Sequence, residues 1–152
     1  MSLIPFAPFV RLRHGRQVTR NVSTPARAGT TSESMKSNFV SLHPYFKVHP
    51  GKLDAVKAGF PRFVEKTATE KDCLFYGFTV SGEEIFCREA YESAEGVLAH
   101  LDNIGALLAE MLTMSDLTRL EVHGPATELE KLKAPLAHLN PKWFALEASL
   151  PL

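Results

Sequence analysis

The sequence predicts an α+β domain with the split βαβ, ferredoxin-like order β-α-β-β-α-β and an extra C-terminal α-β pair. Three observations support this prediction. The globular region opens with a strand of alternating apolar residues, two β-rich runs around a short glycine turn form a hairpin, and one long amphipathic helix follows. In this arrangement the antiparallel sheet carries both helices of the six-element unit on one face.

The first two expected elements are a strand over residues 38–48 and a helix over residues 52–66. On the strand, Ser41, His43 and Tyr45 share one face, opposite an apolar one. Pro44 lacks an amide donor, which favours an edge strand or a bulge. The helix carries a stripe of apolar residues, and its glycine and Pro61 are expected to bend or divide it.

The hairpin is expected over residues 73–80 and 84–91, joined at Ser81-Gly82. Both faces of its first strand are apolar: Leu74, Tyr76, Phe78 and Val80 on one, and Cys73, Phe75 and Gly77 on the other. Because helices cover only one face of such a sheet, the second face requires another cover. We expect a homodimer in which two sheets pack face to face.

The central helix begins after the N-cap residue Ser93 and repeats apolar residues with the i, i+3, i+4, i+7 spacing of a buried stripe. His100 lies inside this stripe. Gly96 and Gly105 weaken the helix, which suggests close backbone approach or a slight bend. A fourth strand over residues 117–123, a shorter helix ended early by Pro135, and a last strand over residues 142–149 complete the expected fold.

The composition divides the chain into a basic segment, residues 1–36, and a globular domain, residues 37–152. The segment holds six basic residues and one acidic residue, so its net charge is +5 and that of the remainder is −5. Its arginine, serine and threonine content is typical of an organelle transit peptide, directed to the mitochondrial matrix or plastid stroma. The alternatives are a basic arm that is retained, or a start at Met35, with the protein then cytoplasmic.

The net charge of zero gives no general attraction for nucleic acid, and no apolar run reaches the length of a membrane span. The two cysteines, Cys73 and Cys87, do not form a disulfide framework or a zinc-binding spacing, and we expect buried thiols in a reducing compartment. No two histidines and a carboxylate share a strand or helix spacing, so no metal site is predicted.

The run Phe86-Cys-Arg-Glu-Ala-Tyr, followed by Val97-Leu-Ala-His-Leu, resembles the antibiotic biosynthesis monooxygenase (ABM) domain family. Glu89, Tyr91 and Ala99-His100-Leu101 match that family's acidic-x-aromatic and Ala-His-Leu signatures, and the resemblance covers about residues 38–124. It implies a dimeric α/β barrel. The family includes cofactor-independent oxygenases of quinols and phenols, haem-degrading proteins and members of unknown role. A second histidine that many members carry is absent here, and Asn103 is the polar group that could substitute for it.

The resemblance implies a cofactor-independent monooxygenase acting on a small quinol or phenolic substrate. In such an enzyme an apolar pocket, a base and hydrogen bonds to a developing oxyanion assist an ionised substrate in reducing O2. His100 suits the base, because burial disfavours its charged form. Glu89 would orient His100, and Asn103 would complete the polar set. The structural alternatives are a core histidine satisfied by a neighbour and a carboxylate paired with Arg88, Arg119 or a lysine.

Three further residues are candidates for binding a small aromatic ligand: His43, Tyr76 and Trp143. Each also fits an ordinary role in the core or in the dimer interface. Two other functions are consistent with the sequence. The first is a non-catalytic subunit of the same fold that holds a ligand or joins an assembly; the second is a haem protein with His100 as the axial ligand. No cofactor is expected for the oxygenase.

Overall fold

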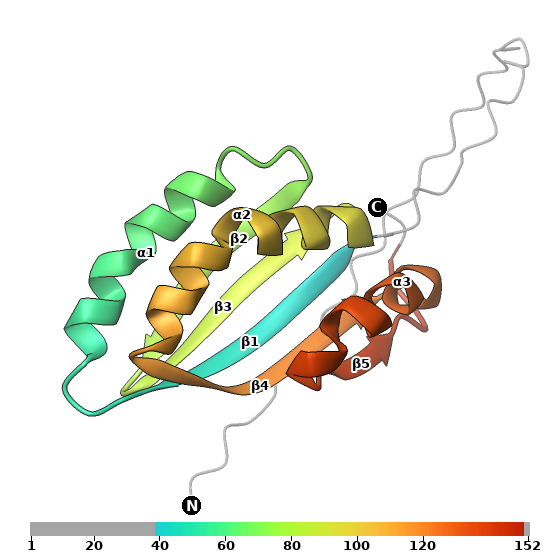
Figure 1. Cartoon of the computed structure of the whole chain (residues 1–152). Helices are drawn as coiled ribbons and strands as arrows, with labels where there is room; N and C mark the ends of the chain where they lie inside the picture. The colour runs from blue at the N-terminus through green and yellow to red at the C-terminus, as the bar shows by residue number, and fades with distance from the viewer. Residues whose placement is uncertain (1–38, 151–152) are drawn as a thin grey trace, which may run out of the picture. The chain divides into compact units, whose positions relative to one another are not determined.

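The computed structural model describes residues 39–150; the basic segment predicted at residues 1–36 lies outside this range. Five strands form one sheet in the order β2-β3-β1-β4-β5 (Figure 1). The elements are, in chain order, β1 (Val40–Val48), α1 (Leu53–Thr67), β2 (Cys73–Ser81), β3 (Glu84–Tyr91), α2 (Ala94–Leu112), β4 (Ser115–Gly124), α3 (Ala126–Leu136), the 3-10 turn η1 (Ala137–Leu139) and β5 (Lys142–Ala145).

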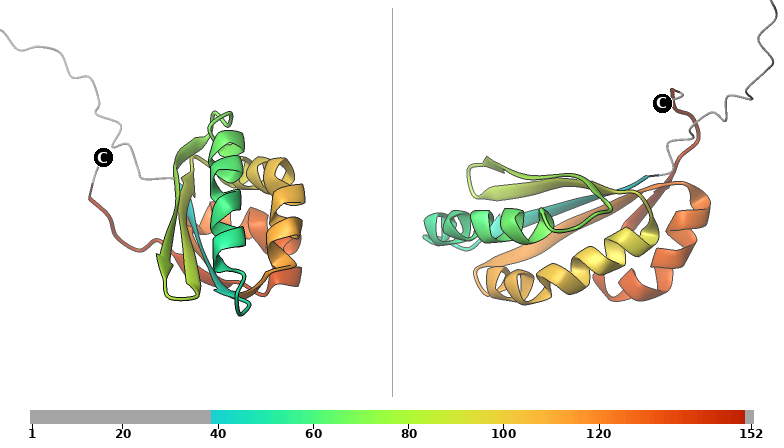
Figure 2. Two further views of the ribbon diagram at one scale, coloured as in Figure 1. Left: turned by 90° about the vertical axis from the view of Figure 1, so that its left-hand side faces the viewer. Right: turned by 90° about the horizontal axis from the view of Figure 1, so that it is seen from above.

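The predicted fold class is confirmed. The first four strands pair antiparallel, with β1 between β3 and β4, and the extra strand β5 adds parallel to β4. Parallel pairing of β4 and β5 follows from the helix between them, because a parallel partner requires a crossover connection. The three helices lie on one face of the sheet (Figure 2). We refer to this face as the covered face and to the other as the open face.

Three local predictions differ from the structure, and one made for Pro44 is confirmed in part. Pro61 does not divide α1, which is continuous from Leu53 to Thr67; the residue is exposed, so water can hydrogen-bond to the carbonyl that loses its partner. Pro44 lies in the central strand, and the second predicted alternative, a bulge, is confirmed, because the register of β1 against β4 shifts between Tyr45 and Phe46. No atom would lie within 4 Å of a Cβ on Gly105. The last strand ends at Ala145.

The start of β2 also departs from simple alternation. The register of β2 against β3 shifts between Cys73 and Phe75, which is the signature of a bulge. Consequently Cys73 packs against the core of the covered face, whereas Leu74 is 48% exposed. The predicted sharing of a face by Cys73 and Phe75 was therefore wrong. Both cysteines are free thiols; Cys87 is buried, as expected, whereas Cys73 is only partly buried.

The core of the covered face consists of two apolar clusters. The first cluster lies toward α3 and comprises Val40, Leu42, Tyr91, Ala94, Val97, Leu120, Val122, Leu129, Leu132 and Leu136. The second lies toward α1 and comprises Phe46, Val48, Val56, Phe63, Ile85, Ile104, Leu107 and Met111. Leu117 packs against both. The helix α2 contributes to each cluster, so it spans the junction between them.

The open face carries a chain of aromatic rings. The His43 ring lies 4.6 Å from that of His123 and 5.7 Å from that of Phe86, between ring centroids, and His123 stacks on Phe144 at 4.4 Å. The face also exposes Phe75 and Phe144, each 42% accessible. Apolar and aromatic side chains thus line both faces of the sheet, as the sequence of β2 predicted.

Candidate functional site

The position of α2 over the sheet is fixed by local chemistry at its N-terminus. The Ser93 hydroxyl accepts a hydrogen bond from the Gly96 amide at 3.2 Å, which is the expected N-cap. A Cβ on Gly96 would lie 2.9 Å from Cβ of Asp72 and 3.3 Å from Cβ of Tyr91. The close approach predicted for Gly96 is therefore present. This close approach allows α2 to pack directly against β3. One turn further along the helix, the His100 residue faces the sheet and is 1% exposed.

His100 lies between two carboxylates. Its Nδ1 is 2.9 Å from Glu70 Oε2, in the loop between α1 and β2, and its Nε2 is 3.3 Å from Glu89 Oε2 on β3. The Tyr91 hydroxyl donates to the same Glu89 oxygen at 2.5 Å. The side chains of His100 and Glu89 are 1% and 6% exposed and that of Glu70 is 11% exposed. We call Glu70, His100, Glu89 and Tyr91 the relay.

Asn103 supports the relay from one turn further along α2. Its Nδ2 donates to Glu70 Oε1 at 2.7 Å and to the Lys66 carbonyl at 3.1 Å. The Lys66 ammonium in turn donates to the Asn103 carbonyl at 2.7 Å. These bonds tie α2 to the end of α1 and hold the Glu70 carboxylate against His100. Asn103 therefore acts through Glu70 and does not contact Glu89.

Burial sets the protonation of the relay. Burial raises the pKa of Glu89 from 4.5 to about 8, aided by the charge of Glu70 and opposed by the hydrogen bond from Tyr91. Burial also lowers the pKa of His100 from 6.5, against the attraction of Glu70. At neutral pH the favoured state is thus a neutral imidazole beside a protonated Glu89. In that state the Glu89 acid can donate its proton to Nε2, while Nδ1–H donates to Glu70.

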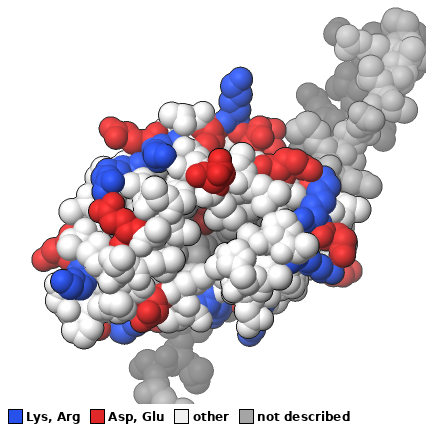
Figure 3. Space-filling model, in the orientation of Figure 1, with Lys and Arg blue, Asp and Glu red and all other residues white. Residues whose placement is uncertain are grey.

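The relay opens into an apolar pocket beneath α2. The space in which a water-sized molecule can be centred amounts to about 70 Å³, and Figure 3 shows a hollow between α2 and α3 with a mostly uncharged rim. Its walls come from both core clusters. The lining residues are Leu42, Pro44, Phe46, Phe63, Tyr76, Phe78, Cys87, Glu89, His100, Leu101, Ile104, Leu108, Met111, Leu112, Leu117, Leu120, Leu136 and Leu139.

The other end of the relay reaches the outer surface. Glu70 lines a separate depression together with Val64, Thr67, Ala68, Cys73 and Tyr76, and it does not line the pocket beneath α2. Tyr76 contributes to both walls. A proton can therefore pass from this depression through Glu70 and the two nitrogens of His100 to Glu89, which faces the pocket. Such a route exchanges protons with solvent while the pocket itself stays apolar.

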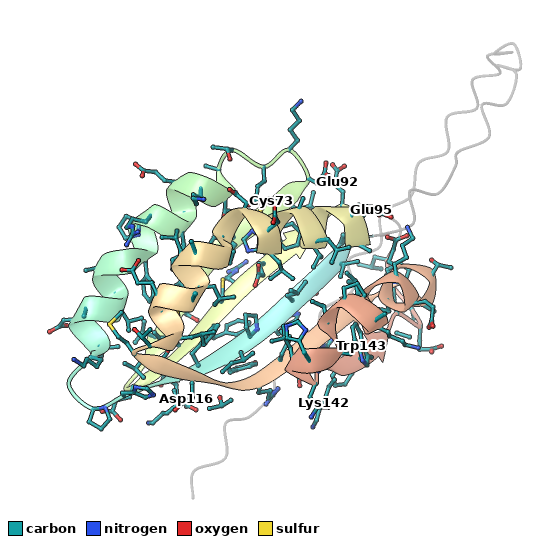
Figure 4. The ribbon with its side chains drawn as sticks, viewed as in Figure 1. Cys73, Glu92, Glu95, Asp116, Lys142 and Trp143 are labelled. Carbon is teal, nitrogen blue, oxygen red and sulfur yellow. The ribbon has the colours of Figure 1, made fainter. Side chains whose placement is uncertain are left out.

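The structure brings together some of the predicted site residues and separates others. Glu89, His100 and Tyr76 line one pocket, and the Tyr76 ring lies 5.3 Å from the His100 ring. Burial raises the pKa of Tyr76, so its hydroxyl remains neutral. His43 lies on the open face, on the far side of the sheet from His100. Trp143 lies on β5 beside α3 and packs against the first core cluster without lining the pocket (Figure 4).

Sequence reasoning missed Glu70. It lies in a polar loop, 30 residues before its partner His100, and the loop shows no periodicity that would indicate its direction. The alternative in which Glu89 pairs with an arginine is not found. Arg88 lies over the Phe75 ring, with its guanidinium carbon 5.4 Å from the centroid, and Arg119 pairs with Glu121. The sequence did contain one indication of such a partner: a buried imidazole requires a hydrogen-bond partner at each ring nitrogen, and Glu70 is the partner at Nδ1 of His100.

Among residues 39–150, no group of three or more histidine, cysteine, aspartate or glutamate side chains is arranged to hold a metal ion. In the same range, no helix combines the length and apolar character needed to cross a bilayer.

Three solved structures show what the chain is similar to. MupZ from Pseudomonas fluorescens is 42% identical, with a TM-score of 0.72 over 74% of this chain and 93% of MupZ. A candidate antibiotic biosynthesis monooxygenase from Caulobacter crescentus is 24% identical, with a TM-score of 0.52 over 57% of this chain and 88% of that protein. Rv0793 from Mycobacterium tuberculosis is 23% identical, with a TM-score of 0.51 over 57% and 94%. No family model and no curated protein matches the chain.

Proposed function

We propose that this chain, which belongs to the family of MupZ and shares the fold of antibiotic biosynthesis monooxygenase domains, is an acid–base enzyme acting on a small, largely apolar substrate. The observation that carries this proposal is the Glu89–His100 pair at the wall of the pocket. A buried acid and a neutral base in contact are expensive to maintain without a role in binding or catalysis.

In the first candidate reaction, the enzyme is a cofactor-independent monooxygenase of a small phenol or quinol. The relay accepts the proton of the substrate hydroxyl, and the resulting anion donates electrons to O2. A hydroperoxide forms at a ring carbon that bears hydrogen, and loss of water leaves a carbonyl there. One oxygen atom enters the product and the other leaves as water, so atoms and electrons balance. Glu89 supplies the proton for the departing hydroxide.

In the second candidate reaction, the pair transfers a proton without oxidation, as in an enolisation or elimination. The raised pKa of Glu89 favours this candidate. A carboxylic acid that stays protonated at neutral pH can donate to a substrate oxygen, and when Glu89 donates to the substrate, Nε2 of the neutral His100 is freed to accept a proton. Such a reaction needs no O2. Oxygen dependence therefore separates the two candidates.

The test is to incubate the full-length protein with a panel of phenols, quinols and enolisable ketones while O2 uptake is followed with an electrode and solvent deuterium incorporation by mass spectrometry. We expect turnover in the wild type and its loss in His100→Ala. His49→Ala is the matched control, since His49 pairs with Asp116 at the surface. Deuterium incorporation under argon identifies the second candidate. Equal rates in wild type and His100→Ala would contradict the proposed role of His100.

The same panel separates the enzyme from a ligand-binding or assembly subunit. Binding without turnover of any compound, under air or argon, would favour the non-catalytic function. A haem protein has less support from the geometry. Both ring nitrogens of His100 face carboxylates, Nδ1 toward Glu70 and Nε2 toward Glu89, whereas an axial ligand needs one nitrogen directed at the iron.

We also propose that the open face is covered by the same face of a second copy. The aromatic rings of the open face, including the exposed Phe75 and Phe144, would then be buried between the two sheets. Sedimentation equilibrium should give twice the mass of the chain at micromolar concentration. Phe144→Asp should shift this mass toward that of a monomer, whereas a wild-type monomer at that concentration would contradict the proposal.

Residues 1–36 are proposed to act as a targeting peptide for an organelle, on composition alone. Fusing these residues to a fluorescent protein should direct it to mitochondria or plastids. A diffuse cytoplasmic signal would contradict the proposal.

A further inference from the structure

The pocket beneath α2 has two chemically different halves. Three of the aromatic lining residues, Phe63, Tyr76 and Phe78, lie on the α1 and β2 side, and a fourth, Phe46, lies on β1. Tyr76 and Phe78 pack edge to face at 5.4 Å. Toward β4 and α3 the lining is leucine: Leu117, Leu120, Leu136 and Leu139. The two ionisable groups, Glu89 and His100, are near the aromatic half, because the Tyr76 and His100 ring centroids are 5.3 Å apart.

Of these leucines, Leu117 and Leu120 lie on β4. The other two, which we call the leucine wall, belong to a segment that follows the six-element unit. Leu136 is the last residue of α3, and Leu139 is the last residue of η1. The segment is held firmly, because Leu129 and Leu132 on the same helix are 3% and 0% exposed in the first core cluster. Asn140, in the left-handed conformation at φ 48°, then turns the chain into β5. The wall is therefore a fixed boundary of the pocket.

The geometry of the sheet sets a distance between the relay and this wall. Glu89 lies on β3, and the leucine wall lies over β4, two strands away in the order β3-β1-β4. Neighbouring strands are about 4.8 Å apart, so the separation is roughly 10 Å across the sheet. No charged side chain lines this part of the pocket. A flexible alkyl chain fits such a passage, whereas a compact ring would leave it empty.

We propose that the substrate is an amphiphile whose oxygen-bearing head group lies between Glu89, His100 and Tyr76, and whose aliphatic tail runs to Leu136 and Leu139, which limit its length. This inference rests on the proposed acid–base function for the placement of the head group. It adds a specificity role for the α3–η1 segment. Each methylene that enters the passage should tighten binding, and methylenes beyond the wall should not.

The test uses the 4-alkylphenols from 4-methylphenol to 4-nonylphenol as probes of the full-length protein. Trp143, the single tryptophan of the chain, packs against the same core cluster as Leu139 and reports binding by its fluorescence. We expect the Kd of the wild type to fall about three- to fourfold per added methylene. The fall should stop at the chain length that reaches the wall.

Two substitutions at one position should move this limit in opposite directions. In Leu139→Ala the Kd should continue to fall up to longer alkyl chains, and in Leu139→Phe it should stop falling at shorter ones. The Kd of 4-methylphenol should be the same in all variants. Leu150→Ala, at a leucine that is 82% exposed, is the matched control. Leu139 is only partly buried, so neither variant is expected to unfold, and circular dichroism checks this.

A Kd independent of chain length, or a limit that stays in place in both Leu139 variants, would overturn the inference. Failure of the acid–base function gives a different result. If the relay does not catalyse, chain-length dependence and its shift in the Leu139 variants persist, but no compound is turned over. His100→Ala should likewise retain the chain-length dependence while losing turnover.

Discussion

Two imidazole clusters lie on opposite faces of the same sheet, and they differ in what surrounds them. On the covered face, His100 is 1% exposed and has a carboxylate at each ring nitrogen. On the open face, His43 meets the Ser41 hydroxyl at 3.0 Å and the ring of His123. The nearest carboxylate there, Glu121, pairs with Arg119 at 2.8 Å and lies farther, 3.7 Å, from Nε2 of His123.

The difference shows that burial alone does not make a histidine reactive. Burial lowers the pKa of both His100 and His43. Only His100 has a buried acid beside it and a pocket in front of it, so only His100 can exchange a proton with a bound molecule. The aromatic surroundings of His43 suit packing between sheets.

The largest expected effect is on turnover. His100→Ala should lower kcat by at least about 100-fold, the lower end of what a general acid–base group contributes. His123→Ala, on the open face, should leave kcat unchanged, because its ring packs on His43 and Phe144 and does not line the pocket. Steady-state rates of both variants on the first active substrate of the panel provide the measurement. A comparable loss in His123→Ala would remove the distinction between the two clusters.

The second effect is a pH dependence of stability from Glu89. Its pKa is about 8 in the folded protein against 4.5 as the ordinary value, so between these values the folded state retains a proton that the unfolded chain releases. The Glu89 contribution to the free energy of unfolding should therefore fall as pH rises from about 4.5 to 8, by at most about 1.4 kcal/mol per pH unit. The lowered pKa of His100 acts in the opposite direction below its ordinary value of 6.5, so the net fall should be clearest between about 6.5 and 8. Urea denaturation across this range measures it.

Glu89→Gln is the control, since an amide can still accept from Tyr91 and does not titrate. The variant should lose this slope and gain stability over the wild type at pH 9. The same slope in wild type and variant would assign the titration to another group.

A third effect concerns the contact that holds α2 over the relay. Gly96→Ala should destabilise the protein by about 1–3 kcal/mol, because its Cβ would be forced within 2.9 Å of Cβ of Asp72. Gly105→Ala, on the same helix with no atom within 4 Å of the new Cβ, should instead stabilise by about 0.5–1 kcal/mol. Thermal unfolding should show a lower Tm than the wild type for Gly96→Ala and a higher one for Gly105→Ala. Destabilisation by both would show that α2 is packed closely along its length.

The smallest effect is expected on the open face. Burial, followed by the charge of His123, lowers the pKa of His43, although Glu121 acts against it and Arg119 adds to it. Pairing of two such faces disfavours protonation further, so the proposed dimer should weaken a few-fold as pH falls from 7.5 to 5.5. Sedimentation at both pH values measures the dissociation constant. His43→Phe should remove most of the dependence, and an unchanged dependence would place the titrating group elsewhere.

Much of the covered face could be predicted from the sequence, because helical spacing alone turns His100 inward with Val97 and Ile104. Glu70 could not, since its approach to His100 depends on how a loop returns to β2. The bulge after Cys73 also escaped prediction, because one extra residue changes the face of every residue before it. These features depend on tertiary contacts, whereas the apolar periodicity is local.

The most direct test of the account is the protonation of Glu89 itself. Carbon-13 NMR of protein labelled at the glutamate carboxyl, with the Glu89 signal assigned by its absence in Glu89→Gln, gives the pKa of this group in the folded protein. The account predicts a titration near 8 that moves when His100 is replaced by alanine. A titration near the ordinary value of 4.5 would show an ionised carboxylate beside His100 and would contradict the proposed acid–base pair.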